Sequence, residues 1–317
     1  MMGFLVSVVS ALFFPGIILR VKSIASGRKG PGILQPWKNI AVLLRKASVF
    51  SPVTGIIFRI APAVYLATIL CSMLLLPFPG MGSFLGFEGD FVLFAYLLAL
   101  GKFLFILGAL DTGSSFEGMG ANREALYSML AEPAFFILFG TLALLTGHTS
   151  MQDIFSSFRF AGDSSFIIGA IAVYLLIQIA MIENSRMPVD DPKTHLELTM
   201  IHEVMILDHS GFDLALIHIG TTLKFCLYGM LIACFVVPPS LTMSFGGGAV
   251  NPVLMRFLQA GICLGIQGVF AAMIGLLESF RARKKMVRNP QFIATLSSIA
   301  LVAFFLALLL TFNLMAP

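Results

Sequence analysis

Long apolar runs alternate with shorter polar segments along the whole chain. A transmembrane helix needs roughly 20 mostly apolar residues, and eight runs approach that length. They lie at about 2–19, 60–77, 91–110, 126–146, 166–182, 214–237, 253–277 and 292–314. Charged residues, Gly and Pro separate these runs. The pattern predicts an all-α polytopic membrane protein with about eight transmembrane helices, in a single membrane domain that covers 1–317.

Composition strengthens this prediction. Hydrophobic types make up 58% of the 317 residues and charged types 11%, and the mean hydropathy is +0.96. A soluble domain carries roughly a quarter charged residues, and it cannot hide this much apolar surface in one core. A soluble enzyme, a disordered protein and a disulfide scaffold are therefore excluded. The cysteines lie in apolar stretches without a CxxC pair, so we expect no iron–sulfur or zinc centre held by cysteine in this chain.

Lys and Arg residues gather on one side of the predicted bundle. If the N-terminus lies outside, the inner segments are 20–59, 111–125, 183–213 and 278–291. These segments carry sixteen of the twenty Lys and Arg residues, whereas the outer segments carry only Arg159. Positive residues are enriched on the cytoplasmic side of membrane proteins. Both termini are therefore predicted outside, with the protein in the cell inner (cytoplasmic) membrane.

The segment 20–59 is basic and rich in helix breakers, with eight basic residues and no acidic one. Its centre holds Arg28, Lys29, Gly30, Pro31, Gly32, Gln35 and Pro36. This density of Gly and Pro predicts a shaped loop, followed by an amphipathic surface helix over 45–59. Attraction to anionic lipid is one interpretation. Because lipid attraction needs charge alone, the Gly/Pro geometry favours a surface that docks a partner protein or lines a head-group pocket.

Ionisable residues inside the predicted spans form a second group of candidates. Lys102, Glu132 and Lys224 lie within apolar runs, where a charge is costly unless it faces the bundle interior, a partner or water. Pro133 can open the helical hydrogen bonds beside Glu132. We expect Lys102 or Lys224 to pair with Glu132 or with the acids after Glu183. For Glu132 itself, anchoring a Lys or Arg and a functional role are both open.

The inner segment 183–213 holds seven acids and three His against two bases. Glu183 closes the fifth span, where burial disfavours a charged carboxylate, and carboxylates tuned in this way can relay protons together with His. We expect Arg123 and Arg186 to lie close enough to Glu132 and Glu183 to tune them. The candidate ion-relay residues are Glu132, Glu183, Asp190, Glu197, Glu203, Asp111 and Glu117, and the candidate charge partners are Arg123, Arg186, Lys102, Lys224, His195 and His202.

Two local expectations complete this picture. Asp111, Glu117, Arg123 and Glu124 are expected in a loop between the third and fourth spans. His195, His202 and His209 recur every seven residues, which would place them near one face of a helix. No HExxH motif is present, so a solvated or pairing face, or a proton relay, is favoured over a metal site.

Several motifs together resemble those of the complex I membrane subunit that builds the quinone cavity. The segment 27–37 is similar to the first cytoplasmic loop of that family. The run Glu183-x-x-Arg186-x-Pro188-x-Asp190-x-Pro192 matches the family's signature after the fifth span, with Glu197-Leu198 as its continuation. Arg123 and Glu132 keep the spacing of the family's arginine and membrane glutamate. The resemblance covers essentially the whole chain and implies an ion-coupling role for the matching carboxylates.

Other segments resemble the hydrogenase branch of this family more than the quinone branch. Lys193 and His195 stand where the quinone branch has acids, and the runs 111–117 and 194–203 look like those of membrane-bound hydrogenases, including formate hydrogenlyase. This resemblance implies a non-catalytic membrane anchor beside a hydrogenase-like large subunit, an iron–sulfur small subunit and antiporter-like membrane subunits. Nickel–iron and iron–sulfur centres would then lie in the partners, with no cofactor bound by this chain and no role for nucleic acid.

Two alternatives remain open from the sequence. The chain could be the quinone-site subunit of a complex I-type NADH:quinone oxidoreductase, with a quinone near the 20–59 loop. It could also be a stand-alone ion-coupled secondary transporter, although we find no paired interrupted spans and no internal repeat. In the favoured interpretation, the basic loop 20–59 and the acidic loop 183–213 are docking and coupling surfaces, and either protons or sodium ions are moved.

Overall fold

The computed structural model describes residues 2–78, 82–158, 163–190, 200–237, 252–281 and 286–315. This part of the chain is built of α-helices. The long helices are α1 (Met2–Ala25), α3 (Ile56–Leu75), α4 (Asp90–Asp111), α5 (Ser115–Thr146), α7 (Asp163–Glu183), α9 (Gly211–Val236), α11 (Pro252–Phe280) and α12 (Asn289–Met315). The short ones are α2 (Gln35–Leu44), α6 (Met151–Ser157) and α8 (His202–Met205), with a 3₁₀ turn at Met286–Arg288. Eight helices within these described ranges are long and apolar enough to cross a membrane, which confirms the predicted eight-span fold.

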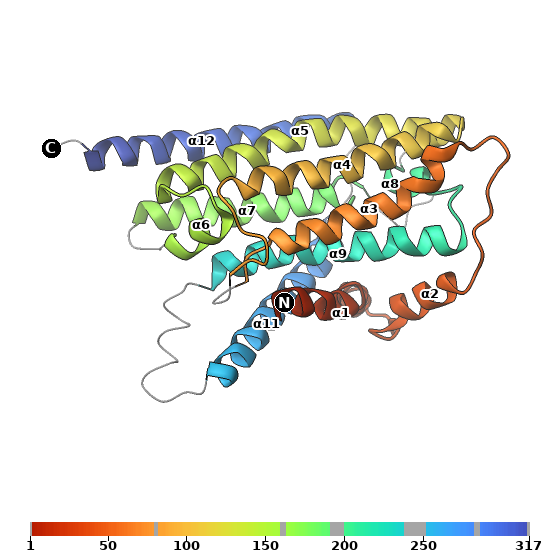
Figure 1. Ribbon diagram of the computed structural model, residues 1–317, viewed down its shortest axis with the longest axis horizontal. Helices are drawn as coiled ribbons and strands as arrows, with labels where there is room; N and C mark the ends of the chain where they lie inside the picture. The colour runs from red at the N-terminus through yellow and green to blue at the C-terminus, as the bar shows by residue number, and fades with distance from the viewer. Residues whose placement is uncertain are drawn as a thin grey trace.

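The long helices form a bundle in which α9 is central. Most of them run side by side, whereas α11 runs obliquely to the others (Figure 1). α9 packs against α1, α2, α3, α7 and α11. In its most apolar window 78% of the residues are buried, compared with 28% to 56% in the other spans. α9 is therefore the span that the other described helices cover most completely.

The helix α5 begins earlier than the sequence predicted. The turn after α4 is short, and Gly113 in that turn has a φ of 69°, which glycine adopts without strain. α5 then runs for 32 residues from Ser115. The expectation of a loop over 111–125 is therefore wrong: Glu117, Arg123 and Glu124 lie on the first turns of a helix. Gly118 and Gly120 in this stretch are poor helix formers, so packing of these turns against α8 and the backbone of Ile201, and not propensity, stabilises them.

The surface helix is also displaced from its predicted place. The break expected after α1 is present, but the amphipathic helix is α2, and 45–55 is not helical. Pro36 lies in the first turn of α2, where its missing N–H costs nothing, and Ile40 is the buried residue of this helix. Arg59 belongs to the first turn of α3. The prediction of a helix over 45–59 is therefore wrong.

A single tryptophan fastens α2 to α1. Pro15 lies inside α1, and its lack of an N–H leaves the carbonyl of Ala11 without its intrahelical donor. The Nε1–H of Trp37 donates to that carbonyl oxygen at 3.1 Å. The backbone of Ile33 lies so close to Gly16 that a Cβ there would overlap its carbonyl. The loop and α2 are thus held against the proline break in α1.

Candidate functional site

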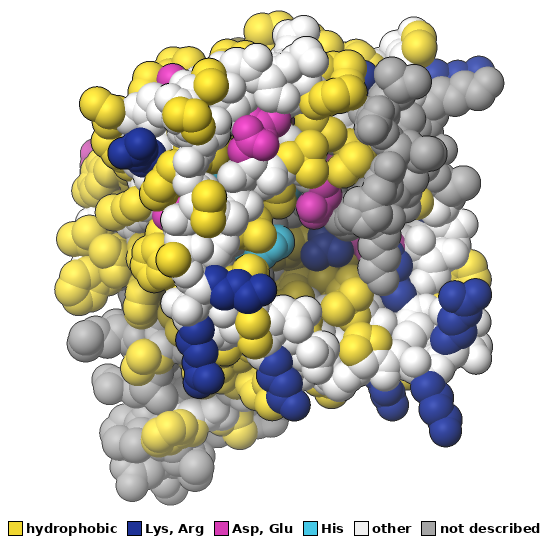
Figure 2. Space-filling view, turned by 90° about the vertical axis from the view of Figure 1, so that its right-hand side faces the viewer, with side chains coloured by type: hydrophobic (Ala, Val, Ile, Leu, Met, Phe, Trp, Pro, Cys, Tyr) yellow, Lys and Arg dark blue, Asp and Glu magenta, His cyan; other side chains and the backbone are white. Residues whose placement is uncertain are grey.

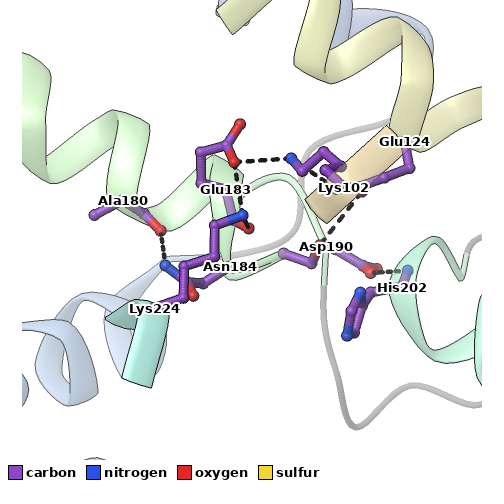
Figure 3. A network of polar contacts seen from close by, with 9 residues as sticks. Lys102, Glu124, Ala180, Glu183, Asn184, Asp190, His202 and Lys224 are labelled. Carbon is purple, nitrogen blue, oxygen red and sulfur yellow. Dashed lines mark hydrogen bonds and ion pairs between the residues drawn. The ribbon is translucent and has the colours of Figure 1, made fainter. Parts of the chain in front are cut away.

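Four ionisable side chains from four helices meet inside the bundle (Figure 3). We call them the charge cluster: Lys102 of α4, Glu124 of α5, Glu183 of α7 and Lys224 of α9. The Nζ of Lys102 lies 3.0 Å from Glu124 Oε1 and 2.9 Å from Glu183 Oε2. The Nζ of Lys224 lies 2.7 Å from the same Glu183 oxygen and donates to the Glu183 carbonyl oxygen at 3.0 Å. Glu183 therefore lies between two ammonium groups.

Burial makes this pairing necessary. The side-chain exposures are 9% for Lys102, 6% for Glu124, 11% for Glu183 and 1% for Lys224. Two ammonium and two carboxylate groups have no net charge, which satisfies the requirement that ions inside a membrane protein be paired. The expected pairing of Lys102 and Lys224 is therefore found, but Glu132, one of the expected partners, does not take part in it. The lysines pair with Glu183 itself and with Glu124, not with Glu132.

The cluster continues into the chain that follows α7. Ser185 has a φ of 48°, an unusual value for a residue with a side chain, and its Oγ donates to Glu124 Oε2 at 3.5 Å. Asp190 is buried and its Oδ2 accepts the backbone N–H of His202 at 3.2 Å. The side-chain amide of Asn184, directly after α7, donates to the carbonyl oxygen of Ala180 at 2.8 Å. The signature after the fifth span thus forms a compact turn beside the cluster.

A cavity of about 260 Å³ lies on the other side of this turn. We call it the loop-side cavity. Its polar lining includes Asn39 of α2, Arg186, Asp190, His202, Glu203 and His218. Pro15 and Ile40 contribute apolar walls from α1 and α2. Figure 2 shows the corresponding end of the molecule, where acidic, basic and His side chains surround a hollow. Asp190 and Glu203, two predicted relay residues, therefore line one water-accessible space.

A second, smaller cavity lies beyond the charge cluster. It has a volume of about 40 Å³, enough for one or two water molecules, and is lined by Lys102, Glu132, Glu183 and Tyr228. We call it the Glu132 cavity. Glu132 is exposed at the surface of the chain although it lies within the apolar span of α5. The charge cluster consequently separates two cavities, one at the end of the bundle and one that reaches its lateral surface.

His202 and His209 do not share one helix face. α8 ends at Met205, so His202 lies on this helix and His209 lies beyond it. The expectation of a shared helix face is therefore wrong for these two residues. The ring of His209 stacks on Phe58 with centroids 4.0 Å apart and planes 3° from parallel. Loss of solvent lowers the pKa of His202 and of His209 to about 4. Both rings are therefore neutral near pH 7. His195 lies outside the described residues.

Asp111 and Glu117 are placed away from the charge cluster. Asp111 Oδ2 accepts the backbone N–H of Phe58 at 3.1 Å, at the first turn of α3. Glu117 Oε1 accepts the N–H of Asp208 at 3.0 Å, while its buried Oε2 has no hydrogen-bond partner in the described structure. Both carboxylates hold backbone segments together. Glu197, another predicted relay residue, lies outside the described residues.

The two arginines have other partners than predicted. Arg123 donates to the carbonyl oxygen of Met200 at 3.0 Å. Arg186 lies 3.4 Å from Glu278, a fully buried carboxylate that also pairs with Lys22 at 2.7 Å. Neither arginine is paired with Glu132 or Glu183, so the expectation that they tune these acids is wrong. The same rule that selected Lys102 and Lys224, an ion at or inside an apolar span, could have identified Glu278.

The predicted docking residues lie at one end of the bundle. Arg28, Lys29, Gly30 and Pro31 line a surface recess beside the ends of α1 and α11, and Gly32 follows them. Gln35 and Pro36 begin α2. Across the described ranges, no group of three or more His, Cys, Asp or Glu side chains could hold a metal ion. Cys71 is exposed, and Cys226, Cys234 and Cys263 are buried free thiols.

Comparison with known proteins supports the resemblance seen in the sequence. Residues 1–313 match the NADH dehydrogenase family. The chain is 32% identical to hydrogenase-4 component C of Escherichia coli K12 over 226 residues, which cover 71% of this chain and 70% of that protein. It is 28% identical to formate hydrogenlyase subunit 4 of the same organism over 276 residues, which cover 87% of each.

A solved structure has the same fold. A chain of the membrane-bound sulfane sulfur reductase, an archaeal respiratory membrane complex, superimposes with a TM-score of 0.78 at 15% identity and 96% coverage of both chains. This likeness shows a shared fold. The chain therefore belongs to the NADH dehydrogenase family, in the branch that includes hydrogenase-4 component C and formate hydrogenlyase subunit 4.

Proposed function

We propose that this chain is the membrane anchor and energy-coupling subunit of a multisubunit redox complex, a group-4-type nickel–iron hydrogenase similar to formate hydrogenlyase. It connects a soluble electron-transfer module to proton or sodium translocation and does not itself catalyse the redox reaction. Two E. coli relatives, hydrogenase-4 component C and formate hydrogenlyase subunit 4, support the complex type by name. The eight apolar helices support the membrane role.

The observation that carries this proposal is the buried charge cluster between two cavities. Ser185 and Asp190 line the loop-side cavity, and Ser185 contacts Glu124 of the cluster. Lys102 and Glu183 belong to the cluster and also line the Glu132 cavity. Polar groups thus follow one another from the end of the bundle to its lateral surface. A purely structural ion pair would need no cavity on either side.

Coupling through this path is electrostatic. At 4 Å and an effective dielectric constant near 20, one added charge changes the energy of another by about 4 kcal/mol. This energy corresponds to a change of roughly a thousandfold in the protonation equilibrium of the second group. A charge change in the redox module, or a proton in the loop-side cavity near Asp190, can therefore redistribute a proton within the cluster. Lys102 can take part in this redistribution because it contacts both Glu124 and Glu183.

The position of Glu132 supports a neighbouring membrane subunit on the far side of the path. A carboxylate exposed to hydrocarbon in the middle of a span is unfavourable by several kcal/mol. Glu132 is exposed, and it forms no ion pair with any described side chain. A partner helix that covers this surface would remove the penalty and receive the ion. We assign this position to an antiporter-like membrane subunit.

We place the soluble module on the basic loop, at the end of the path that lies away from Glu132. In this proposal Arg28, Lys29, Gly30, Pro31, Gly32, Gln35 and Pro36 contact the hydrogenase-like large subunit or the iron–sulfur small subunit. The positive-inside bias favours that face in the cytoplasm and both termini outside, and we propose the inner membrane as the location. The nickel–iron and iron–sulfur centres belong to these partners.

Cofactor analysis of the intact complex tests the proposal. The complex, purified through a tag on this chain, should contain nickel and iron–sulfur iron in fixed ratio to the chain, and no stoichiometric quinone. If this chain is purified alone and transports ions without partners, it is a secondary transporter. That result would contradict the proposal.

A quinone-site subunit is the second candidate, because the loop-side cavity lies between α1, α2 and α9. Its volume of about 260 Å³ and its mixed lining of Pro15, Ile40 and His202 could accept a ring with polar substituents. Bound quinone without nickel in the purified complex would favour this candidate. Hydrogen-dependent activity that persists after complete quinone extraction would exclude it.

A further inference from the structure

Two hydroxyl groups in the wall of the Glu132 cavity lack a hydrogen-bond partner. Ser128 of α5 and Tyr228 of α9 both line this cavity, and they are only 8% and 2% exposed. The Oγ of Ser128 is buried without a partner in the described structure. The hydroxyl of Tyr228 forms no hydrogen bond with any described residue. Because buried hydroxyl groups are normally bonded to protein or to ordered water, these two groups point to a ligand inside the cavity.

The size and lining of the cavity identify this ligand as water. Its volume of about 40 Å³ suits one or two water molecules and is too small for an organic ligand. Most of the wall is apolar, with Leu98, Phe135 and Ile179 among its residues. A buried water needs two to four polar partners. The two hydroxyl groups, together with the charged groups of the same wall, supply them.

The cavity fills a gap in the path. Glu124, Ser128 and Glu132 follow one another at intervals of four residues on α5, which places them near one side of that helix. Glu132 forms no ion pair and no hydrogen bond with Lys102 or Glu183, although all three line the cavity. Proton transfer needs donor and acceptor atoms about 3 Å apart, or one water between them. A proton therefore crosses from the charge cluster to Glu132 only through a bridging water.

The same wall disfavours a metal cation as the transferred ion. The ammonium group of Lys102 lines the cavity. Glu183 Oε2 already lies 2.9 Å from Lys102 Nζ and 2.7 Å from Lys224 Nζ. A sodium ion beside this oxygen would be repelled by two positive charges at short range. A water molecule, in contrast, accepts a hydrogen bond from an ammonium group and donates one to a carboxylate.

We propose that Ser128 and Tyr228 position an ordered water that passes protons between Glu183 and Glu132. This inference rests on the coupling role proposed above. The protonated Glu183 carboxyl gives its proton to the water oxygen, and the water gives one of its own protons to the Glu132 carboxylate. One O–H bond forms and one breaks at the water, so the water is regenerated and no oxidant or reductant takes part. The two hydroxyl groups keep their protons and act as positioning residues.

Removal of one hydroxyl at a time tests the inference. Tyr228→Phe deletes a single oxygen and keeps the ring, and its matched control is Tyr127→Phe, since Tyr127 is a buried phenol that lines neither cavity. Ser128→Ala is the second test variant. Its control is Thr141→Val, because the Thr141 hydroxyl is buried in the same helix and bonded within it. Each intact complex is reconstituted in vesicles, and proton translocation is followed with a pH-sensitive dye in sodium-free medium.

We expect translocation per assembled complex to fall about fivefold in each test variant, the factor that one hydrogen bond of ordinary strength contributes, and to stay unchanged in both controls. Electron transfer from the soluble module to artificial dyes should persist in all four. A density map of the complex should show a water bonded to both hydroxyl groups in the wild type and lose it in Tyr228→Phe. Unchanged translocation in either test variant, or an equal loss in its control, overturns the inference.

Glu132→Gln, measured in the same vesicles, separates this inference from the proposed function. If Glu132→Gln stops translocation while Tyr228→Phe and Ser128→Ala do not, the coupling path holds and the water assignment fails. If none of the three variants changes translocation, the path itself fails. A strict requirement for sodium at constant pH would leave the coupling role in place and overturn proton transfer through the water.

Discussion

Replacing Glu183 by Gln perturbs the centre of the charge cluster. The change keeps the shape of the side chain but removes its charge and its titrating proton. Lys102 would still lie 3.0 Å from Glu124. Lys224 would lose the carboxylate at 2.7 Å and keep the Glu183 carbonyl oxygen at 3.0 Å. The substitution therefore leaves one buried ammonium without a counterion.

The structure sets the size of the expected effect. Removing one partner of a buried ion pair costs about 3–5 kcal/mol, because the remaining charge stays desolvated. The Lys224 side chain is only 1% exposed, so little of this cost is relieved by water. We expect a lower thermal midpoint for the variant and assembly at reduced temperature. Ion translocation in reconstituted vesicles should fall at least tenfold, while electron transfer from the soluble module to artificial dyes is unchanged.

Two further variants separate the relay from stability. Glu183→Gln/Lys224→Met restores charge balance, so it should regain stability without regaining translocation. Glu278→Gln is the matched control, because Glu278 is fully buried, pairs with Lys22 and Arg186, and lines neither the loop-side nor the Glu132 cavity. It should lower stability and leave translocation per assembled complex intact. Normal translocation in Glu183→Gln, or restored translocation in the double variant, would refute the relay and leave Glu183 as a structural ion-pair member.

Further predictions concern the ends of the path and the fold around it. Glu132→Gln should assemble normally and keep dye-linked electron transfer, but reduce ion translocation in vesicles; unchanged translocation would contradict its place on the path. Charge reversal of Arg28 and Lys29 should release the soluble module during purification while the membrane part assembles, and an intact, fully active complex would contradict docking. Trp37→Phe should lower stability by about 1 kcal/mol through the lost hydrogen bond, measured by thermal unfolding; no change would show that the contact does not hold α2. His209 has a pKa of about 4 in the fold against 6.5 when exposed, so its stabilising effect is present above pH 6.5 and is lost as pH falls towards 4, by about 1.4 kcal/mol per pH unit. His209→Phe keeps a ring beside Phe58 and should flatten the pH dependence of unfolding between pH 6.5 and 5; an unchanged slope would assign that dependence to other groups.

The sequence by itself determined the number of spans and the family. A run of about 20 apolar residues must cross a bilayer whatever its neighbours are, because the environment acts on each helix separately. The same cost argument identified Lys102 and Lys224 as ions that must be paired. The motif after Glu183 and the match of 1–313 to one family lead to the same conclusion.

Tertiary structure decided which charges meet. Glu183 pairs with Lys224 of a helix 41 residues away along the chain, and Lys102 contacts Glu124 on a helix that the sequence pattern began too late. Helix rotation and neighbour choice are set by packing around α9, and no local pattern specifies them. The position of α2 against α1 likewise depends on a contact, the donation from Trp37 to the carbonyl that Pro15 leaves free in α1. The requirement that a buried ion be paired can be inferred from the sequence, but its partner depends on which helices come together in space.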